Sequence, residues 1–361
     1  MLTEQKLTQY MDENARLKHY IGFEISGYVH LGTGLLCMRK LADFQKAGIE
    51  TNVFMADYHS WINEKLGGNL DDIRAATPYF KEALKKSIEA VGGDPEKVNF
   101  ILASDLYKDE GLKYFENVMK VSKSLTLSRA KRTLTITGKR EGEGTSFAQL
   151  LYIPMQVADI FTMGINIAHA GMDQRKAHVV ALESAKQFGY SPVAVHHHLL
   201  MSISLTQEQR EKIMKAKASG QRGEFEEVME SDVKMSKSKP ASAIFIHDSE
   251  EVVRSKIGKA FCPQAELDAN PVIDLVRYVV WPSKMAKDSK IIISNVKTGA
   301  ESSYDTLLEF EKSYAAGIIH PLDLKAYVAD EISSILAPAR KYFLEGAGRR
   351  YLEQLDLILK K

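Results

Sequence analysis

The chain has 361 residues, 45% of them hydrophobic and 26% charged, which is the composition of a globular protein with enough apolar material for a core. Its formal net charge is +1 at pH 7, which excludes a general electrostatic attraction to nucleic acid and leaves only local basic patches for RNA binding. The two cysteines, Cys37 and Cys262, exclude a disulfide framework and a zinc motif, and they predict a reducing, cytoplasmic location. The N-terminal stretch is polar and no long apolar run occurs in the sequence, so we expect no signal peptide and no contact with a membrane.

Strands and helices alternate through the first hundred residues. A glycine-punctuated turn at 26–34 follows the first strand and leads into a helix that ends at Gly48. A later helix is predicted to start at Thr77, because Pro78 would then occupy its first turn, and to end at 92–93. The strands expected in this part of the chain are 20–24, 52–57 and 98–103.

The alternation resumes after a helical, basic stretch at about 110–148, which we interpret as an insertion in the sheet. Residues 206–232 form a charged helical excursion, and the pattern after 240 is mainly helical. The sequence therefore predicts an α/β fold, a Rossmann-like doubly wound parallel sheet in residues 1–240, followed by a mainly α-helical domain in residues 241–361. The remaining elements expected are helices at 150–163 and 174–188 and strands at 165–170 and 193–200.

Two short motifs favour a phosphate site. Lys234-Met235-Ser236-Lys237-Ser238 reads as a cationic loop, although lysines three residues apart carry little weight alone in a chain with 48 Lys and Arg. The turn before the first long helix holds His30-Leu31-Gly32, where glycine lets the backbone approach phosphates and the helix start offers free N–H groups. It is not a Walker loop, and a lone loop histidine is more often structural. The two motifs together favour a nucleotide site.

One face of the helix at 150–163 is unexpectedly polar. Tyr152, Gln156 and Asp159 are four and three residues apart, so they share a face that would be apolar if it met only the core. Two interpretations stay open, an ordinary solvated face or the wall of a polar cleft. Tyr20 has the same ambiguity, because a buried strand aromatic is common.

These motifs resemble those of the class I aminoacyl-tRNA synthetases, most closely the archaeal and eukaryotic type of tyrosyl-tRNA synthetase. The resemblance spans nearly the whole chain. One position departs from the family pattern, because Thr33 stands where the first motif usually has a second histidine. The matching stretches include Tyr20-Ile21-Gly22-Phe23-Glu24, Gly171-Met172-Asp173-Gln174-Arg175-Lys176 and His320-Pro321-Leu322-Asp323-Leu324-Lys325.

The resemblance implies that ATP activates tyrosine and that the tyrosyl group then passes to the 3′ end of its tRNA. It implies that Mg²⁺ accompanies ATP and that no protein nucleophile is needed, so that alignment and charge stabilisation supply the catalysis. The implied catalytic residues are His30, Lys234 and Lys237. ATP-binding roles fall on Gly32, Thr33, Lys234, Met235, Ser236 and Lys237.

For tyrosine, the resemblance assigns the phenol hydroxyl to Tyr20 and Asp159 and the α-amino group to Tyr152, Gln156 and Gln174. For tRNA, it places Arg132, Arg175 and Lys176 near the acceptor stem and Asp323 at the first anticodon base, in an anticodon-binding C-terminal domain. The competing interpretation of the basic residues is a solvated helix face. The resemblance also implies a homodimer that uses the stretch at about 110–148.

Two other functions stay open. A tryptophanyl-tRNA synthetase shares both motifs, but an indole has no hydroxyl to satisfy Tyr20 and Asp159 together. A synthetase-derived RNA-binding protein without catalysis is favoured only by Thr33. His196-His197-His198 is not interpreted as a metal site, because consecutive side chains of a strand point to opposite faces.

Overall fold

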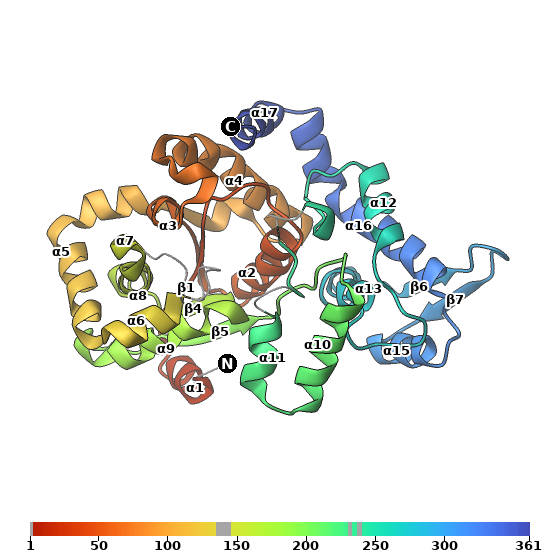
Figure 1. Cartoon of the computed structure of the whole chain (residues 1–361), viewed down its shortest axis with the longest axis horizontal. Coiled ribbons are helices and arrows are strands. Elements are labelled where there is room, and N and C mark those ends of the chain that lie inside the picture. Colours follow the sequence, from red (N-terminus) through yellow and green to blue (C-terminus); the bar gives the residue numbers. More distant parts are fainter. Residues whose placement is uncertain (1–2, 135–145, 230–232, 237–239) are drawn as a thin grey trace.

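The computed structural model describes residues 3–134, 146–229, 233–236 and 240–361. At its centre lies a five-stranded sheet in the order β3-β2-β1-β4-β5, with every neighbouring pair parallel (Figure 1). The predicted doubly wound α/β fold is confirmed. The strands are β1 (Lys18–Phe23), β2 (Glu50–Met55), β3 (Val98–Leu102), β4 (Ile167–Gly171) and β5 (Val193–His197).

The strand order creates one point where the winding reverses. From β1 the chain adds β2 and β3 on one side, and it later returns to add β4 and β5 on the other side. Ligands of open α/β sheets bind beyond the carboxyl ends of the strands at such a point. Here that point lies between β1 and β4, where the loops after Phe23 and Gly171 leave the sheet.

Alternate residues of the strands enter two different cores. Ile21 and Val53 join the core that contains α2 and α4, whereas Tyr20 and Phe54 join the core that contains α5, α8 and α9. The helices of these two layers are α2 (Cys37–Lys46), α3 (Asp57–Ile62) and α4 (Leu70–Ala90) on one side, and α5 (Ala103–Ser124), α6 (Leu127–Thr133), α7 (Phe147–Leu150), α8 (Tyr152–Thr162) and α9 (Arg175–Ser184) on the other; α1 (Glu4–Asp12) precedes the sheet.

The predicted start of the second long helix is wrong. Helix α4 begins after Asn69, whose side chain accepts hydrogen bonds from the N–H groups of Asp71 and Asp72. Pro78 lies inside the helix, and the Thr77 hydroxyl donates to the Ile73 carbonyl rather than capping an end. A proline is tolerated at an internal position when packing of the helix outweighs the lost hydrogen bond.

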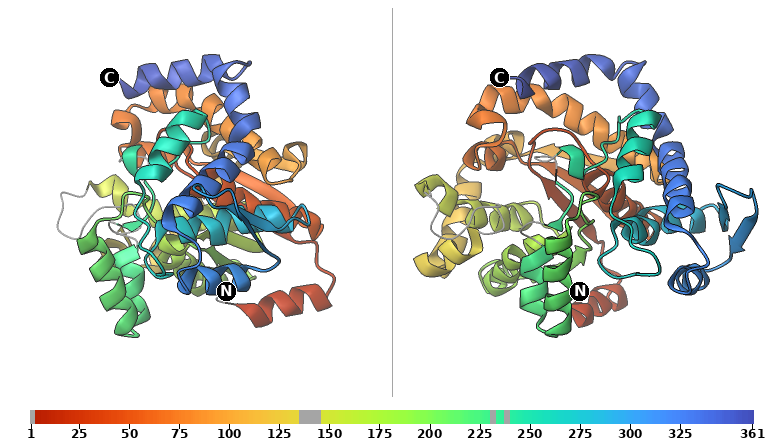
Figure 2. Two further views of the ribbon diagram at one scale, coloured as in Figure 1. Left: turned by 90° about the vertical axis from the view of Figure 1, so that its right-hand side faces the viewer. Right: turned by 45° about the vertical axis from the view of Figure 1, so that its right-hand side comes forward.

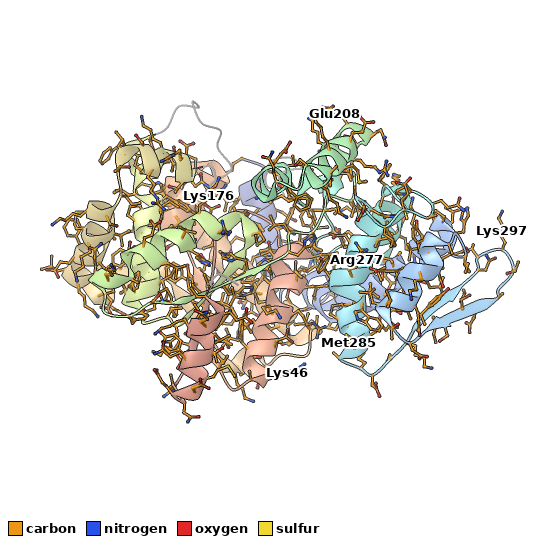
Figure 3. The ribbon with its side chains drawn as sticks, turned by 90° about the horizontal axis from the view of Figure 1, so that it is seen from below. Lys46, Lys176, Glu208, Arg277, Met285 and Lys297 are labelled. Carbon is orange, nitrogen blue, oxygen red and sulfur yellow. The ribbon has the colours of Figure 1, made fainter. Side chains whose placement is uncertain are left out.

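The charged excursion forms two helices, α10 (Gln207–Ala218) and α11 (Arg222–Val228), which project from the body, and Figure 3 shows Glu208, near the start of α10, at the edge of the molecule. After residue 240 the chain is mainly helical, as predicted, but it also contains an antiparallel hairpin that the sequence did not reveal. This region comprises α12 (Glu250–Lys259), α13 (Pro271–Leu275), α14 (Trp281–Met285), β6 (Ile291–Ser294), β7 (Glu301–Tyr304), α15 (Leu307–Ala315), α16 (Pro321–Leu344) and α17 (Arg349–Leu359).

The C-terminal helices return to the sheet half of the molecule. Helix α17 lies across α4, and one apolar core runs from Ile21 to Ile358 (Figure 2). The hydroxyl of Tyr342 donates to Glu82, and the hydroxyl of Tyr28 donates to Asp356. These contacts bring the elements after residue 240 against the N-terminal turn.

Candidate active site

The turn that carries His30 is fixed by backbone pairing with a segment far along the chain. His30 and Phe245 form an antiparallel bridge, with Leu31 N donating to Ile244 O at 3.0 Å and Ile246 N donating to Val29 O at 3.0 Å. Ile244 follows the motif at 234–238, here named the lysine loop, by only a few residues. This pairing therefore brings the two predicted phosphate motifs to the same end of the sheet.

The His30 ring is oriented by its own turn. Its Nδ1 accepts the Gly32 N–H at 3.1 Å, and its Nε2 lies 3.3 Å from the Thr33 hydroxyl. A Cβ at position 32 would lie 3.0 Å from the ring, so glycine allows this close approach. Thr33, the departure from the family pattern, therefore contacts the histidine that the motif retains.

The start of the lysine loop is held by backbone hydrogen bonds to the segment that follows β5. Met201 and Lys234 form an antiparallel bridge, flanked by hydrogen bonds from Ser202 N to Val233 O and from Met235 N to Leu200 O, both at 2.7 Å. The side chain of Met235 is buried. Ser236 accepts a hydrogen bond from Ser242 through its carbonyl, and Lys237 lies outside the described residues.

Lys234 reaches across to the loop that follows β4. Its Nζ lies 2.9 Å from Asp173 Oδ2, in an ion pair that is partly exposed. Asp173 belongs to a stretch on which the resemblance rests, but no role for it was predicted. The cation of the loop thus lies at the carboxyl end of β4, next to the point where the sheet reverses.

Asp159 of α8 is fully buried among polar side chains, and this cluster is named the pocket. Its Oδ1 accepts a hydrogen bond from the Tyr107 hydroxyl at 3.0 Å, and its Oδ2 lies 3.5 Å from His59 Nε2. Burial raises the pKa of Asp159 well above its usual range, and the hydrogen bond from Tyr107 opposes that rise. Oδ2 accepts no hydrogen bond from the residues that the structure describes, although a buried acceptor normally has a partner.

Tyr20 shares this pocket. It is buried among Phe54 and Tyr152, and burial raises the pKa of its hydroxyl, to which the charge of Asp159 adds. A Cβ at position 22 would lie 2.5 Å from the Tyr20 hydroxyl, so Gly22 leaves the space that this ring occupies. The predicted pair, Tyr20 and Asp159, is therefore brought together.

Two tyrosines next to Asp159, Tyr107 and Tyr114, were not predicted as site residues. Tyr107 and Tyr114 stack at a centroid distance of 4.0 Å, although seven residues of a straight helix span about 10.5 Å. Gly111 breaks α5 between them with φ 50° and ψ −120°, which only glycine adopts readily. Two tyrosines on one helix were the only signal available, and the bend that joins them could not be predicted.

The opposite wall of the pocket carries the predicted amide and hydroxyl groups. The Tyr152 hydroxyl donates to Glu24 Oε1 at 3.0 Å, and Gln156 Nε2 donates to Gln174 Oε1 at 3.3 Å. Glu24, at the end of β1, was missed as a site residue. It also accepts a hydrogen bond from Asn63 at 2.8 Å, so Tyr152 is held by a carboxylate that is itself fixed. Gln156 and Gln174 are therefore brought together, and Tyr152, on the same helix as Gln156, is held by Glu24.

The basic residues lie on two neighbouring helices beside the pocket. Arg129 of α6 pairs with Glu183 of α9, which joins the two helices. Arg132 and Lys176 are exposed on these helices, and Figure 3 shows Lys176 on the outer surface of α9. Arg175 is half-buried, and its Nε is buried without a partner among the described residues.

Asp323 lies far from this pocket, near the start of α16. Its carboxylate is buried and accepts hydrogen bonds from Asn295 Nδ2 and Val296 N, both at 2.9 Å. It thereby holds the turn of the β6–β7 hairpin, whose outer end carries Lys297 (Figure 3).

The three consecutive histidines have three different partners. His196 contacts His178, His197 contacts His169, and His198 contacts Asp274. His197 belongs to a buried row in which the ring nitrogens of His19, His169 and His197 lie 3.0 and 2.8 Å apart, ending 3.3 Å from the Cys37 sulfur. Burial lowers the pKa of His19 to about 3 and that of His197 to about 4, and it lowers the pKa of His169 as well.

Comparison with known proteins places this geometry in a family. Residues 11–337 match the family model of class I tRNA synthetases (W and Y). A tyrosine--tRNA ligase from Pyrococcus furiosus is 48% identical over 369 residues, which cover 99% of this chain and 94% of the relative. The crystal structure of tyrosyl-tRNA synthetase from Pyrococcus horikoshii in complex with L-tyrosine has a TM-score of 0.88 at 46% identity, covering 98% and 94% of the two chains.

A tryptophanyl-tRNA synthetase from Aeropyrum pernix shares the fold with a TM-score of 0.65, at 18% identity over 99% of this chain and 84% of that one. In the described part of the chain, no helix is long and apolar enough to cross a membrane.

The buried histidine row predicts a stability that depends on pH. The native pKa values lie below the value of about 6.5 for an unfolded histidine, so the unfolded chain binds more protons, and the free energy of unfolding falls as the pH drops from about 6.5 toward 4. His169→Gln keeps a donor and an acceptor but does not titrate. Chemical denaturation between pH 7 and pH 5 should show a mean slope reduced by about 1 kcal/mol per pH unit, because the unfolded histidine is only partly protonated in the upper half of this range.

Phe44→Leu is the matched control, because Phe44 packs against the rings of His19 and His169. It should lower the stability equally at every pH. A His169→Gln variant with the slope of the parent chain would contradict the prediction.

Proposed function

The chain belongs to the class I tRNA synthetases of tryptophan and tyrosine, and we propose that it acts as a tyrosine--tRNA ligase. In the first step the carboxylate of tyrosine attacks the α-phosphate of ATP, and pyrophosphate leaves to give tyrosyl-adenylate. In the second step a ribose hydroxyl at the 3′ end of tRNA(Tyr) attacks the activated carbonyl, and AMP leaves. The observation that carries this proposal is the buried Oδ2 of Asp159, which accepts no hydrogen bond from the described part of the chain and lies near Tyr20.

A phenol satisfies that pocket better than an indole or a phenyl ring. Its hydroxyl can donate to Asp159 Oδ2 and accept from the Tyr20 hydroxyl. Indole has one N–H and no acceptor, and phenylalanine would leave Asp159 desolvated without a donor, which costs free energy in a buried site. Because the Tyr107 hydroxyl already donates to Asp159 Oδ1, the carboxylate oxygen left to accept a hydrogen bond from the phenol is Oδ2.

The amino-acid backbone would lie between Tyr152, Gln156 and Gln174. Their hydroxyl and amide oxygens accept hydrogen bonds from an ammonium group, and Glu24 behind Tyr152 adds negative charge at that end. The substrate carboxylate then points toward the His30 turn, where the phosphates of ATP would lie.

The phosphates would be bound by both motifs. His30 and the backbone at Gly32 and Thr33 supply donors on one side, while Lys234, Met235, Ser236 and Lys237 supply them on the other. Lys234 would exchange Asp173 for phosphate oxygens, so its charge is compensated both before and after ATP binds. Mg²⁺ enters in this proposal with the phosphates of ATP, as part of the substrate.

The tRNA would lie across two regions. Arg132, Arg175 and Lys176 stand near the pocket, where an acceptor stem must bring its 3′ end, and phosphates favour such cations. Residues 241–361 form the anticodon-binding unit in this proposal, with Asp323 near the first anticodon base. Because Asp323 also holds the hairpin turn, it would act partly by fixing Asn295 and Val296.

The protein would act as a homodimer in the cytoplasm, where tRNA is charged and free cysteines persist. Three apolar side chains of α5, namely Leu112, Phe115 and Met119, are 71%, 57% and 37% exposed, and they recur every three to four residues. Phe147 of α7 and Leu127 of α6 add to the apolar surface of the same inserted region. Contiguous apolar surface of this kind marks an interface.

Asp159→Ala should impair tyrosine binding and leave ATP binding intact. Loss of a hydrogen bond to a buried charge costs about 2–3 kcal/mol, which corresponds to about a 100-fold rise in the KM for tyrosine. The measurement is tyrosine-dependent ATP–pyrophosphate exchange. Lys234→Ala serves as the matched variant, because it should raise the KM for ATP and spare that for tyrosine. An Asp159→Ala chain with parental dependence on tyrosine would refute the assignment.

Asp323→Ala should separate the two steps of the reaction. It removes the acceptor that holds the hairpin turn, so kcat/KM for tRNA in aminoacylation should fall about tenfold while pyrophosphate exchange stays unchanged. Asp305→Ala, which breaks the exposed ion pair with Lys290 at the base of the hairpin, is the control and should alter neither step. Equal losses in both steps would argue against the tRNA role.

Phe115→Glu should convert the dimer to a monomer, because a charge in the centre of an apolar interface is left desolvated and unpaired. Sedimentation velocity of the purified protein measures the change. Leu308→Glu replaces a side chain that is 59% exposed in the C-terminal region, and it should leave the dimer intact. If both variants sediment like the parent chain, α5 is not the interface.

A further inference from the structure

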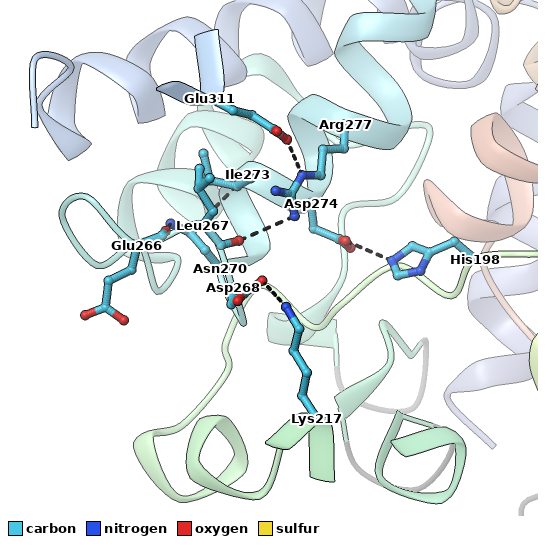
Figure 4. A network of polar contacts seen from close by, with 10 residues as sticks. All are labelled: His198, Lys217, Glu266, Leu267, Asp268, Asn270, Ile273, Asp274, Arg277 and Glu311. Carbon is cyan, nitrogen blue, oxygen red and sulfur yellow. Dashed lines mark hydrogen bonds and ion pairs between the residues drawn. The ribbon is translucent and has the colours of Figure 1, made fainter. Parts of the chain in front are cut away.

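The buried carboxylate of Asp274, in the C-terminal region, binds the segment at 198–201, which pairs with the start of the lysine loop. Asp274 of α13 is 3% exposed, and both of its oxygens are used. Oδ1 lies 2.8 Å from His198 Nε2, and Oδ2 accepts the Met201 N–H at 2.9 Å. Figure 4 shows Asp274 and His198 pointing toward each other from the two halves of the molecule.

His198 is held a second time by the same helix face. The ring of Tyr278, four residues after Asp274, stacks on the His198 ring at a centroid distance of 4.0 Å and an interplanar angle of 17°. A spacing of four residues places both side chains on one face of the helix, so both contact His198, directly after β5.

The helix that carries Asp274 is itself anchored. Asn270 caps α13 by accepting the N–H groups of Val272 and Ile273, and its amide donates to Glu266 O at 2.9 Å. Arg277, one turn beyond Asp274, pairs with Glu311 at 2.5 Å (Figure 4). Asp274 is therefore a fixed point against which the segment at 198–201 is aligned.

That segment determines where Lys234 stands. The backbone of Met201 bridges Lys234, and the hydrogen bonds of Leu200 and Ser202 fix the residues on either side of it. The path from Asp274 to the lysine is thus one side-chain hydrogen bond followed by one backbone bridge. We propose that Asp274 is a positioning residue for Lys234, through which the C-terminal region sets the place of the phosphate-binding cation. This inference rests on the phosphate role of Lys234 in the proposed function.

The position of Lys234 matters more to ATP than to tyrosine. Asp159 lies on α8 and Tyr20 on β1, and the Tyr20 side chain packs in the core that contains α8, whereas Val272 and Ile273 of α13 pack in the other core. If the segment at 198–201 shifts, Lys234 moves away from the phosphates, where charge develops during the reaction, while the phenol end of the site stays intact.

The test is ATP–pyrophosphate exchange with the full chain carrying Asp274→Ala, Asp274→Asn, Lys234→Ala, or Asp274→Ala combined with Lys234→Ala. Asp268→Ala is the matched control, because Asp268 pairs with Lys217 at 2.6 Å on the exposed side of the same region (Figure 4). Asp274→Asn keeps an acceptor for the Met201 N–H, so it remains informative if the alanine variant does not fold. Thermal unfolding is recorded for each variant.

Asp274→Ala should lower kcat/KM for ATP about tenfold and change the KM for tyrosine by less than about twofold. Asp274→Asn should lie between it and the parent chain, and Asp268→Ala should match the parent. In the Lys234→Ala background, Asp274→Ala should cause little further loss, because residues that act through one group are not additive.

Additive losses in the double variant, or a KM for tyrosine that rises as much as that for ATP, would overturn the inference. Parental ATP dependence in Asp274→Asn together with parental dependence in Asp274→Ala would overturn it too. A Lys234→Ala chain with unchanged ATP dependence would instead remove the phosphate role of Lys234, and the inference with it.

Discussion

Short backbone ladders at the carboxyl edge of the sheet hold the site together. Residues 29–31 pair with 244–246, and residues 200–202 pair with 233–235, so the His30 turn and the Lys234 loop are fixed by hydrogen bonds rather than by their side chains. Backbone pairing is insensitive to side-chain identity, which leaves the motif residues available for a ligand. The parallel sheet supplies the platform, since β1, β4 and β5 all end at this edge.

The burial of Asp159 shows that a group able to distinguish a phenol from a phenyl ring costs free energy in the folded protein. A fully buried carboxylate is unfavourable unless hydrogen bonds compensate it. Here Tyr107 satisfies one oxygen, the other accepts no hydrogen bond from the described residues, and in the proposed function it would accept one from the phenol of the substrate. The incomplete compensation gives a phenol hydroxyl something to gain that a phenyl ring lacks. The stacking of Tyr114 on Tyr107 holds the donor in place, and it depends on the bend at Gly111.

Local patterns in the sequence predicted what local physics determines. Strand alternation identified the five strands, and the spacing of Tyr152, Gln156 and Asp159 identified a polar helix face, because both depend on periodicity alone. The helix start at Thr77 was wrong, since an equally good cap at Asn69 lies eight residues earlier and Pro78 is tolerated inside the helix. The hairpin of β6 and β7 was missed because strands of four residues are too short to show a period.

The partners of the predicted residues were harder to find, and they share one property. Lys234, Tyr152 and His198 are each held by a carboxylate from a distant element, namely Asp173, Glu24 and Asp274. No spacing rule connects residues 61, 128 or 76 positions apart in the chain. A net charge of +1 says nothing of this arrangement, because it sums 48 basic and 47 acidic residues over the whole chain. Replacing Asp173 by a phosphate would then conserve the charge around Lys234, so ATP binding would require a change of partner rather than the desolvation of a free cation.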